Sequence, residues 1–528
     1  MPSGTRNKNN ARRVIGLRYW MLRVLEECEK VSKNFDPDPV HDLRVSLRRC
    51  RSLADGLMAL DPDPAWKAMK KAGKRLFRRL GDLRDTQVMM EWVEKLEPNL
   101  PNEGVSQPIE QPEKSAGDKR NPATEDHHEP VSRALREILH GREKEQKLDA
   151  QIALEEFDRK EWRQWGRSLP WRAARIRPGS ALFKHLALER WTAARELHRQ
   201  ALRNRSQAAL HRLRIGIKKF RYIVENFLPA EHQAWSDGLK EMQDLLGEVH
   251  DLDVLWDTAV KCHVFPNSES RDHWHKRIVA ERAKRIEHYR TRMVGEDSLW
   301  QVWRAGLPQG KQIQILATRR MKTWAHRLDP DFAHSERVTR LALELYDGLL
   351  AWGWEPSVDR GSARSSLFAA ALLHDVGKSE GQKKHQKASF DMIREHGSPL
   401  GWNAADLRRA AIVARFHRGN LPTRRHKALR DLLPDEQKAT IQLAAILRLA
   451  NALDATHDGH IRELQVVRTT SSKNGFQRKG FGAMPEALVI AAQGFRSTSF
   501  AAQTVAAERH LLETVLHRPV LVRPARRV

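Results

Sequence analysis

The stretch HDLRVSLRRCR at residues 41–51 returns at residues 211–221 as HRLRIGIKKFR. In both copies apolar residues recur at the spacing of an amphipathic helix, so each is predicted to be a helix with one buried face. At about 100° per residue, the basic residues of each helix fall within an arc of roughly 80°. Like charges at these spacings repel one another, so a stripe that is present twice predicts an anionic partner. The stripe consists of His41, Arg44, Arg48 and Arg51 in the first copy, and His211, Arg214, Lys218 and Arg221 in the second.

A second pair of stretches shows that the repetition extends beyond one helix. LGDLRDTQVM at residues 80–89 returns as LGEVHDLDVL at residues 246–255, in the same order and at nearly the same offset as the first pair. Roughly the first 300 residues are therefore predicted to form a duplicated, all-helical unit. A stretch near residues 99–130, rich in Pro, Glu, Asn and Ser, lies within the first copy and predicts a disordered insert.

The charge of the chain limits its classes of partner. It has 93 Lys and Arg against 67 Asp and Glu, a formal net charge of +26 over 528 residues. Such an excess attracts nucleic acid, an anionic membrane surface or polyphosphate. Only three cysteines occur, without a CxxC pair, which disfavours a disulfide framework and a thiolate zinc site. We expect a cytoplasmic protein without a membrane span, because no long apolar run and no secretory signal pattern occur.

The paired motifs resemble the CHAD domain, the conserved histidine α-helical domain, over about residues 10–303. The resemblance rests on HxxRxxx[RK][RK]xR in each copy, followed each time by an LGxxxD turn, with Gly81 and Asp85 in the first and Gly247 and Asp251 in the second. It implies two four-helix bundles whose basic helices face a shared cavity, and inorganic polyphosphate as the ligand. The residues expected to bind it are those of the two stripes together with Lys74, Arg78 and Lys240.

Polyphosphate suits a cation-lined groove because it carries about one negative charge per phosphate, which Arg and Lys bind through charge-assisted hydrogen bonds. Platforms for single-stranded nucleic acid interleave aromatic residues with cations, and these stripes do not. No helix-turn-helix or zinc-finger pattern occurs either. Nucleic acid is therefore a secondary candidate.

A second group of chemically active residues lies between residues 334 and 460. His374 and Asp375 close an apolar helix in AALLHDVGKS, with another histidine, His334, about forty residues before them and His417 about forty residues after. Imidazole and carboxylate groups suit divalent metals such as Mn²⁺, Mg²⁺ or Fe²⁺, and a bound metal lowers the pKa of water enough for attack on phosphorus. The spacing therefore predicts a metal-dependent phosphohydrolase site.

This region resembles the HD superfamily of metal-dependent phosphohydrolases, and more narrowly the C-terminal HD-type domain of the exopolyphosphatase/guanosine pentaphosphatase family, over about residues 325–523. AALLHDVG, RFHRGxLP and LAAILRLAxALD follow that family's pattern in order. The family's actin-like ATPase-fold domains have no counterpart, and the CHAD-like half occupies their place. The resemblance implies His374, Asp375 and Lys378 as catalytic residues, and Arg448 and Lys387 as further phosphate contacts. The metal ligands that it implies are His334, His374, Asp375, His385, His417, Asn451 and Asp454.

One of these positions departs from the family. The last metal-binding Asp of HD enzymes corresponds to Asn451, whose amide is a neutral and weaker ligand than a carboxylate. Asp454 lies one helical turn later on the same predicted face and is the candidate replacement.

We therefore expect a mainly α-helical protein. Its predicted parts are a CHAD-like domain at 10–303 (repeats at about 10–98 plus 131–165 and about 180–303), a linker at 304–324, an HD-type domain at 325–465 and a small α+β extension at 466–528. The function that we expect is polyphosphate binding coupled to a metal-dependent phosphohydrolase acting on polyphosphate or a related phosphoanhydride or phosphoester, with nucleotides as further candidate ligands. Two alternatives stay open: a non-catalytic scaffold at polyphosphate granules, and a nucleic-acid-associated phosphohydrolase.

Overall fold

The computed structural model describes residues 16–33, 35–97, 130–467 and 487–525. The chain divides into two compact units: unit 1 contains residues 1–59 and 63–308, and unit 2 contains residues 60–62 and 309–528. The insert expected near residues 99–130 lies outside the described residues, apart from Pro130 at the start of a helix. None of the helices in the described ranges is long and apolar enough to cross a membrane.

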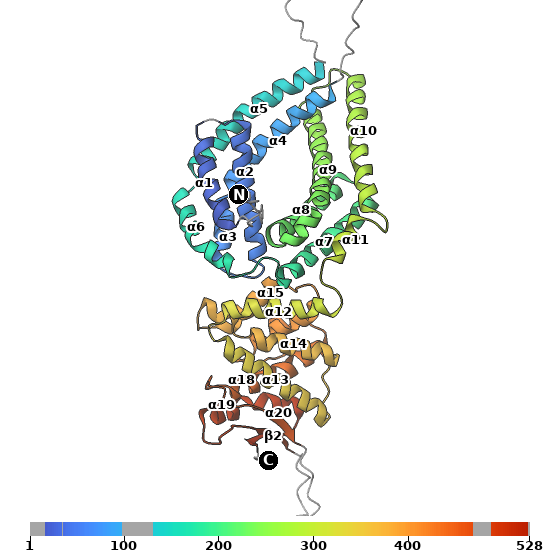
Figure 1. Cartoon of the computed structure of the whole chain (residues 1–528). Helices are drawn as coiled ribbons and strands as arrows, with labels where there is room; N and C mark the ends of the chain where they lie inside the picture. The colour runs from blue at the N-terminus through green and yellow to red at the C-terminus, as the bar shows by residue number, and fades with distance from the viewer. Residues whose placement is uncertain (1–15, 34, 98–129, 468–486, 526–528) are drawn as a thin grey trace, which may run out of the picture. The chain divides into compact units, whose positions relative to one another are not determined.

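Unit 1 is built from the two predicted repeats (Figure 1). The first repeat contains α1 (Leu17–Val31), α2 (Pro37–Leu57), α3 (Pro64–Ala72), α4 (Lys74–Leu96), α5 (Pro130–Glu155) and α6 (Arg159–Ala174). The second contains α7 (Ala181–Asn204), α8 (Gln207–Phe227), α9 (Pro229–Lys261), α10 (Ser268–Met293) and α11 (Leu299–Ala305). Packing repeats as well: α1 lies on α2 as α7 lies on α8, and α4 lies on α5 as α9 lies on α10.

The repeats differ where the first copy has Gly73. This residue separates α3 from α4, whereas α9 runs without a break through the corresponding stretch. The LGxxxD motif was expected to form a turn, and this expectation is wrong. Gly81 and Gly247 lie inside α4 and α9, because a single glycine within a long helix costs only about 1 kcal/mol relative to Ala.

Unit 2 is a helical layer that continues into a small sheet. Its helices are α12 (Lys311–Leu328), α13 (Phe332–Trp352), α14 (Arg360–Leu373), the 3₁₀ helix η1 (Val376–Glu380), α15 (His385–His396), α16 (Ala404–Arg415), α17 (Lys427–Arg430) and α18 (Pro434–Leu453). Residues 304–324, expected as a linker, include most of α12. That segment is helical because Leu316, Met321 and Trp324 give it a buried face.

The sheet at the end of unit 2 has the order β1 (Leu464–Val467), β2 (Leu488–Ala492), β3 (Val520–Pro524). β1 is antiparallel to β2, with Leu464 opposite Ala492, and β2 is parallel to β3, with Leu488 opposite Val520. The parallel connection passes through α19 (Phe500–Glu508) and α20 (His510–Leu516). The mainly α-helical class with a small α+β tail is therefore confirmed.

The two repeats of unit 1 meet where α2 contacts α8. Gly56 of α2 faces the ring of Phe227 from α8, which stacks on Phe183 of α7 with ring centroids 4.1 Å apart. Two polar contacts cross the same boundary: Arg49 Nη2 lies 2.5 Å from Glu225 Oε1, and Asn226 Nδ2 donates to Ser52 Oγ at 3.0 Å. These contacts hold the two basic helices against each other.

Replacing Gly56 should loosen this contact. A Cβ at Gly56 would overlap Phe227 Cε2, so Gly56→Leu forces the stacked rings apart and should lower the free energy of unfolding of unit 1 by about 1–3 kcal/mol. Thermal and urea unfolding of the full chain measure this. Gly141→Leu in α5 is the control, since nothing lies within 4 Å of a Cβ there and a helix-favouring side chain should stabilise slightly. Equal stability of the two variants would contradict the packing described.

Candidate functional site

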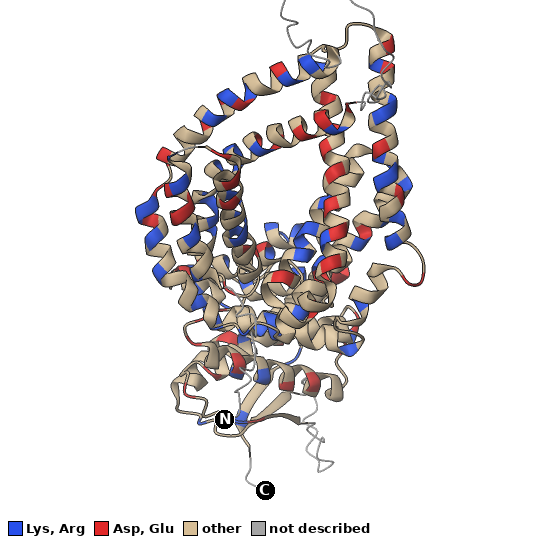
Figure 2. Cartoon of the chain, turned by 45° about the horizontal axis from the view of Figure 1, so that its top comes forward, with Lys and Arg blue, Asp and Glu red and all other residues tan. Residues whose placement is uncertain are grey.

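Four basic residues from α2 and α8 form one cluster, hereafter the cation cluster: Arg44, Arg48, Arg214 and Lys218. Burial, and after it the charges of Arg214, Arg48 and Arg44, lower the pKa of Lys218 to about 8. Burial also lowers the pKa of Arg44, with Arg48 and Arg214 acting in the same direction. Each of these two residues responds to charges on the opposite repeat, so the two basic helices converge. Figure 2 shows that Lys and Arg occur along the helices of both repeats of unit 1.

The cation cluster has few acidic partners of its own. Arg44 Nη1 lies 3.9 Å from Asp85 Oδ1. Within the described ranges, Arg48, Arg214 and Lys218 form no ion pair shorter than 4 Å. Arg49, which lies off the predicted stripe, is instead paired with Glu225. The basic residue beside the stripe is therefore paired with an acid, whereas Arg48, Arg214 and Lys218 on the stripe could pair with an external anion.

Buried polar atoms without partners lie next to the cluster. Arg214 Nε, His211 Nδ1 and Tyr222 Oη are buried and make no hydrogen bond. An unsatisfied buried donor costs about 1–3 kcal/mol, so such atoms are rare unless something else binds there. Their position beside four basic residues indicates a site for an anion.

The LGxxxD motifs add groups whose role the sequence analysis did not assign. A Cβ at Gly81 would lie 3.7 Å from Arg44 Nη2, and one at Gly247 would lie 3.9 Å from Arg214 Nε, so each glycine lies beside the arginine of its own repeat. Burial raises the pKa of Asp251 to about 6, although Arg214 lowers it. The sequence signal that could have identified these groups is the recurrence of Gly and Asp at the same spacing in both repeats.

His250 was missed because its counterpart in the first repeat is Arg84, so that no repeated residue marks the position. Its ring lies 4.5 Å from that of His211 between centroids. Burial lowers the pKa of His250 to about 4, and the charges of Arg214 and His211 lower it as well. Burial also lowers the pKa of His211, so the surroundings of both histidines favour the neutral form.

The other predicted polyphosphate contacts lie farther along the helices. Arg51 Nη1 donates to the carbonyl of Lys70 at 2.8 Å and is thus partly engaged. Arg221 and Lys240 both act on Asp244, whose pKa burial raises and their charges lower. Three more, His41, Lys74 and Arg78, are exposed, and their role in binding stays a prediction.

In unit 2, the ends of four helices bring together a buried group of histidines around one carboxylate. His334 lies in α13, His374 and Asp375 follow α14, His385 begins α15 and His417 follows α16. All are at most 2% exposed. Two sets of three have donor atoms within 4.8 Å of one another: His334 with His374 and Asp375, and Asp375 with His385 and His417.

Asp375 lies between the two sets. Its Oδ2 is 3.3 Å from His374 Nε2 and 4.0 Å from His334 Nε2. Its Oδ1 is 3.1 Å from His385 Nε2 and 3.6 Å from His417 Nε2. Each oxygen faces one set, so this carboxylate could serve as a metal ligand in either set.

Backbone carbonyls fix the orientation of three of the rings. His374 Nδ1 donates to Ala371 O at 2.7 Å and His417 Nδ1 donates to Ala414 O at 2.7 Å. His385 Nδ1 donates in the same way to Gln382 O at 3.0 Å. Because Nδ1 carries the proton, Nε2 presents its lone pair to the centre, as a metal ligand must.

The donor set fits a divalent metal. His374 Nε2 and Asp375 Oδ1 are buried without a hydrogen bond. Burial alone would raise the pKa of Asp375, but the charge of His374 and the nearby histidines hold it well below its usual range, so the carboxylate is ionised. Imidazole nitrogen and carboxylate oxygen suit Mn²⁺, Fe²⁺ or Mg²⁺.

Asn451 and Asp454 have different roles from each other. Asn451 Oδ1 lies 3.0 Å from His334 Nε2 and therefore faces the centre. Asp454 Oδ2 accepts a hydrogen bond from His334 Nδ1 at 2.7 Å, and both its oxygens accept from Arg337 Nε. Its assignment as a metal ligand is wrong, because these contacts occupy its carboxylate. It orients His334 instead.

The structure also revises the expected phosphate contacts. Lys378 Nζ lies 2.5 Å from Asp375 Oδ2, so its positive charge is at the centre. Arg448 was expected to bind phosphate. It is buried and donates to the carbonyls of Phe416 and Gly419 while pairing with Glu508. This expectation is wrong, because Arg448 is fully engaged in holding the segment that carries His417. Lys387 is exposed.

Comparison with known families agrees with this division. The CHAD domain matches residues 21–260, which include both basic helices. The Ppx/GppA phosphatase, domain III, matches residues 317–481, which include the histidine centre. The chain joins a CHAD domain to a Ppx/GppA phosphatase domain III. The resemblances to the CHAD domain and to the C-terminal domain of the exopolyphosphatase/guanosine pentaphosphatase family are thereby confirmed, whereas the assignment to the HD superfamily stays a prediction.

Two further comparisons complete the picture. The crystal structure of the CHAD domain from the plant Ricinus communis is similar at 18% identity and a TM-score of 0.33, over 55% of this chain and 88% of that chain. No curated protein matches the chain.

The amide at Asn451 should limit metal affinity. Asn451→Asp places a carboxylate 3.0 Å from His334 Nε2, and a charged oxygen ligand should tighten Mn²⁺ binding by about tenfold or more. Isothermal titration with Mn²⁺ at fixed pH measures the change. The control is Asn403→Asp, which keeps a good cap at the start of α16. Equal affinities for all three proteins would contradict the place given to Asn451.

Proposed function

We propose that this protein binds inorganic polyphosphate through the cation cluster of its CHAD domain. The observation that carries the proposal is the convergence of Arg44, Arg48, Arg214 and Lys218 from two repeats, with a single intramolecular carboxylate, that of Asp85, within 4 Å among the described residues. A linear anion with many negative charges would reduce the electrostatic repulsion between the two basic helices.

The state of Lys218 supports the same ligand class. Burial, and after it the charges of the other three residues of the cluster, disfavour its charged form and lower its pKa to about 8. A bound polyanion would favour the charged form and raise that pKa. The cluster is therefore a place where added negative charge is stabilised.

Aromatic residues beside the cluster favour inorganic phosphate over single-stranded nucleic acid. The guanidinium of Arg44 lies over the ring of Phe77 at 5.9 Å, and Lys218 Nζ lies over the ring of Tyr222 at 5.9 Å. Faces that are engaged by cations offer no free platform for a base. Phosphate groups need no such platform.

Removing one unpaired arginine from each repeat tests the site. Arg48→Ala with Arg214→Ala should weaken binding of long-chain polyphosphate at least tenfold at about 150 mM salt, because charge-assisted hydrogen bonds are worth about 1.5–3 kcal/mol each. Fluorescence anisotropy or titration calorimetry of the full chain gives the affinity. Arg271→Ala with Lys276→Ala in α10 removes the same charge from exposed positions and should change binding little.

The result would contradict the proposal if both double variants weakened binding equally, since that would mean a diffuse charge effect. Duplex DNA as competitor separates the nucleic-acid alternative. DNA that displaces polyphosphate at this salt concentration would favour a nucleic-acid partner, because nonspecific DNA contacts weaken steeply with salt.

We further infer that the Ppx/GppA-type domain hydrolyses phosphoanhydride bonds with a divalent metal. A metal held by His334, His374, Asp375, His385 and His417 would supply Lewis acidity and an activated water. Lys378 places a positive charge beside Asp375, where it could attract a phosphoryl oxygen. Arg448 and Asp454 act as positioning residues for His417 and His334.

A phosphate-release assay tests this second part. Full-length protein with Mn²⁺ or Mg²⁺ should release phosphate from long-chain polyphosphate, and His374→Ala should reduce the rate by at least about a hundredfold, as expected when a metal site is lost. The exposed His510→Ala is the matched control. If the wild-type protein binds polyphosphate but releases no phosphate with either metal, it is a binding scaffold.

A further inference from the structure

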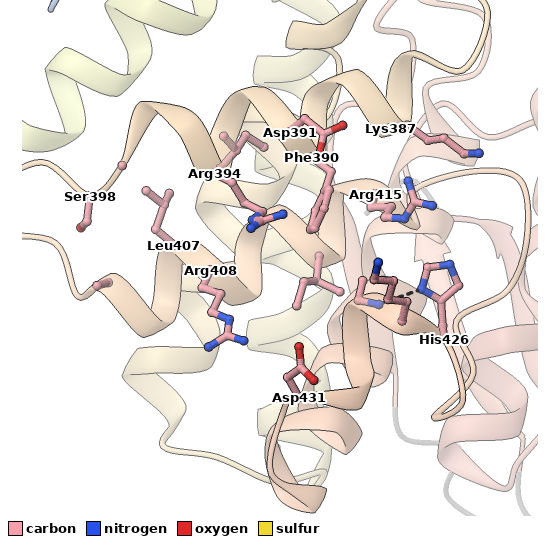
Figure 3. Close-up of a pocket in the computed structure, with 16 residues that line it drawn as sticks. Lys387, Phe390, Asp391, Arg394, Ser398, Leu407, Arg408, Arg415, His426 and Asp431 are labelled. Atoms are coloured by element: carbon pink, nitrogen blue, oxygen red, sulfur yellow. Dashed lines mark hydrogen bonds between the residues drawn. The ribbon is translucent and has the colours of Figure 1, made fainter.

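A cleft of about 850 Å³ lies in unit 2, lined by residues of α15, α16 and α17 (Figure 3). None of the predicted metal ligands lines it, so it is separate from the histidine centre. Its floor is apolar, with Ile393, Leu407 and Ile412 buried beneath it. The volume is that of a site for a small molecule rather than a surface dimple.

The rim of this cleft is strongly basic. Five of its lining residues are Lys or Arg and two are Asp, namely Lys387, Arg394, Arg408, Arg415 and Lys427 against Asp391 and Asp431. In the part of the chain that the structure describes, the four residues Lys387, Arg394, Arg408 and Arg415 form no ion pair within 4 Å. Some exposed arginines elsewhere in unit 2 are paired, as Arg364 is with Asp347 at 2.8 Å, whereas others, such as Arg424 and Arg425, form no ion pair within the described residues. What distinguishes the four cations of the cleft is that they surround one cavity.

An aromatic ring holds two of these cations in place. The guanidinium groups of Arg394 and Arg415 lie 5.2 and 5.7 Å from the ring centroid of Phe390. Figure 3 shows Phe390 within the cleft, with Arg394 to one side of it and Arg415 to the other. Side chains ordered in this way lose less freedom when they bind an anion.

Charged and titratable side chains also lie close together at the other end of the cleft. His426 is half-buried, and burial lowers its pKa, as do the charges of Arg415 and Lys387. These three groups from α15, α16 and the segment before α17 therefore lie close to one another. An anion placed there would meet donors from three separate elements.

We propose that this cleft is a second phosphate-chain site, which binds a short inorganic polyphosphate through Lys387, Arg394, Arg408 and Arg415. Its charge calls for an anion, and its donors, spread along the rim, suit several linked phosphates better than one. A nucleotide is less well matched because the ring of Phe390 is already engaged by two guanidinium groups. The choice of ligand class rests on the proposed function, whereas the site is independent of the cation cluster.

The test uses the full chain with the first site disabled. In an Arg48→Ala/Arg214→Ala background with EDTA present, tripolyphosphate should still bind saturably, at one molecule per chain by titration calorimetry. Adding Arg394→Ala and Arg408→Ala should weaken this binding at least tenfold. Adding Lys438→Ala and Arg496→Ala instead, which removes the same charge from exposed positions of unit 2, should leave it unchanged. Thermal unfolding checks that all variants are folded.

Three results would overturn the proposal. The first is the absence of saturable tripolyphosphate binding in the background variant. The second is an equal loss for the cleft and control substitutions. The third is tighter binding of ATP than of tripolyphosphate, since both carry three phosphates and the difference would come from the base. None of these results affects the cation cluster, whose own test uses Arg48 and Arg214 alone, so the two proposals can fail separately.

Discussion

Repulsion between like charges in a half-buried space is the interaction on which the binding half of this molecule depends. Burial lowers the pKa of Arg44 and of Lys218, and the charges of Arg48 and Arg214 act on both in the same direction. Without other contacts, repulsion between their positive charges would move these side chains apart. Apolar packing prevents this, because the stacked rings of Phe227 and Phe183 lie directly against α2 at Gly56. The energy of that buried contact holds the charges in place before any ligand arrives.

The histidine centre shows the opposite arrangement of charge. One buried carboxylate, that of Asp375, is surrounded by histidine side chains and by the ammonium group of Lys378. The ends of the helices set the orientation of the histidine rings. The last carbonyls of a helix have no partner within it, and those of Ala371 and Ala414 accept the Nδ1 protons of His374 and His417. Each helix end thereby fixes a tautomer as well as a position.

Close helix packing makes this convergence possible. Short side chains line the contacts of α14, α16 and α18, where Ala370, Ala411 and Ala445 are fully buried. Helices with small residues at their contacts approach closely, so that residues at their ends can share one carboxylate. The separate cleft at α15 and α16 is lined by longer side chains. Their cationic groups surround the cavity rather than fill it.

The sequence by itself determined the duplication, the two helices that carry the cations and the residue types of the histidine centre, because helical periodicity and repeated motifs are local properties. It also placed Asn451 where a carboxylate would be expected. Only the tertiary structure decided which polar groups are free and which are engaged. Arg448 and Asp454 have the right chemistry for a site, yet their neighbours from distant segments, Glu508 and Arg337, occupy them. Such pairings join residues that are 60 or more positions apart in the sequence. The periodicity of apolar residues within one helix therefore cannot predict them.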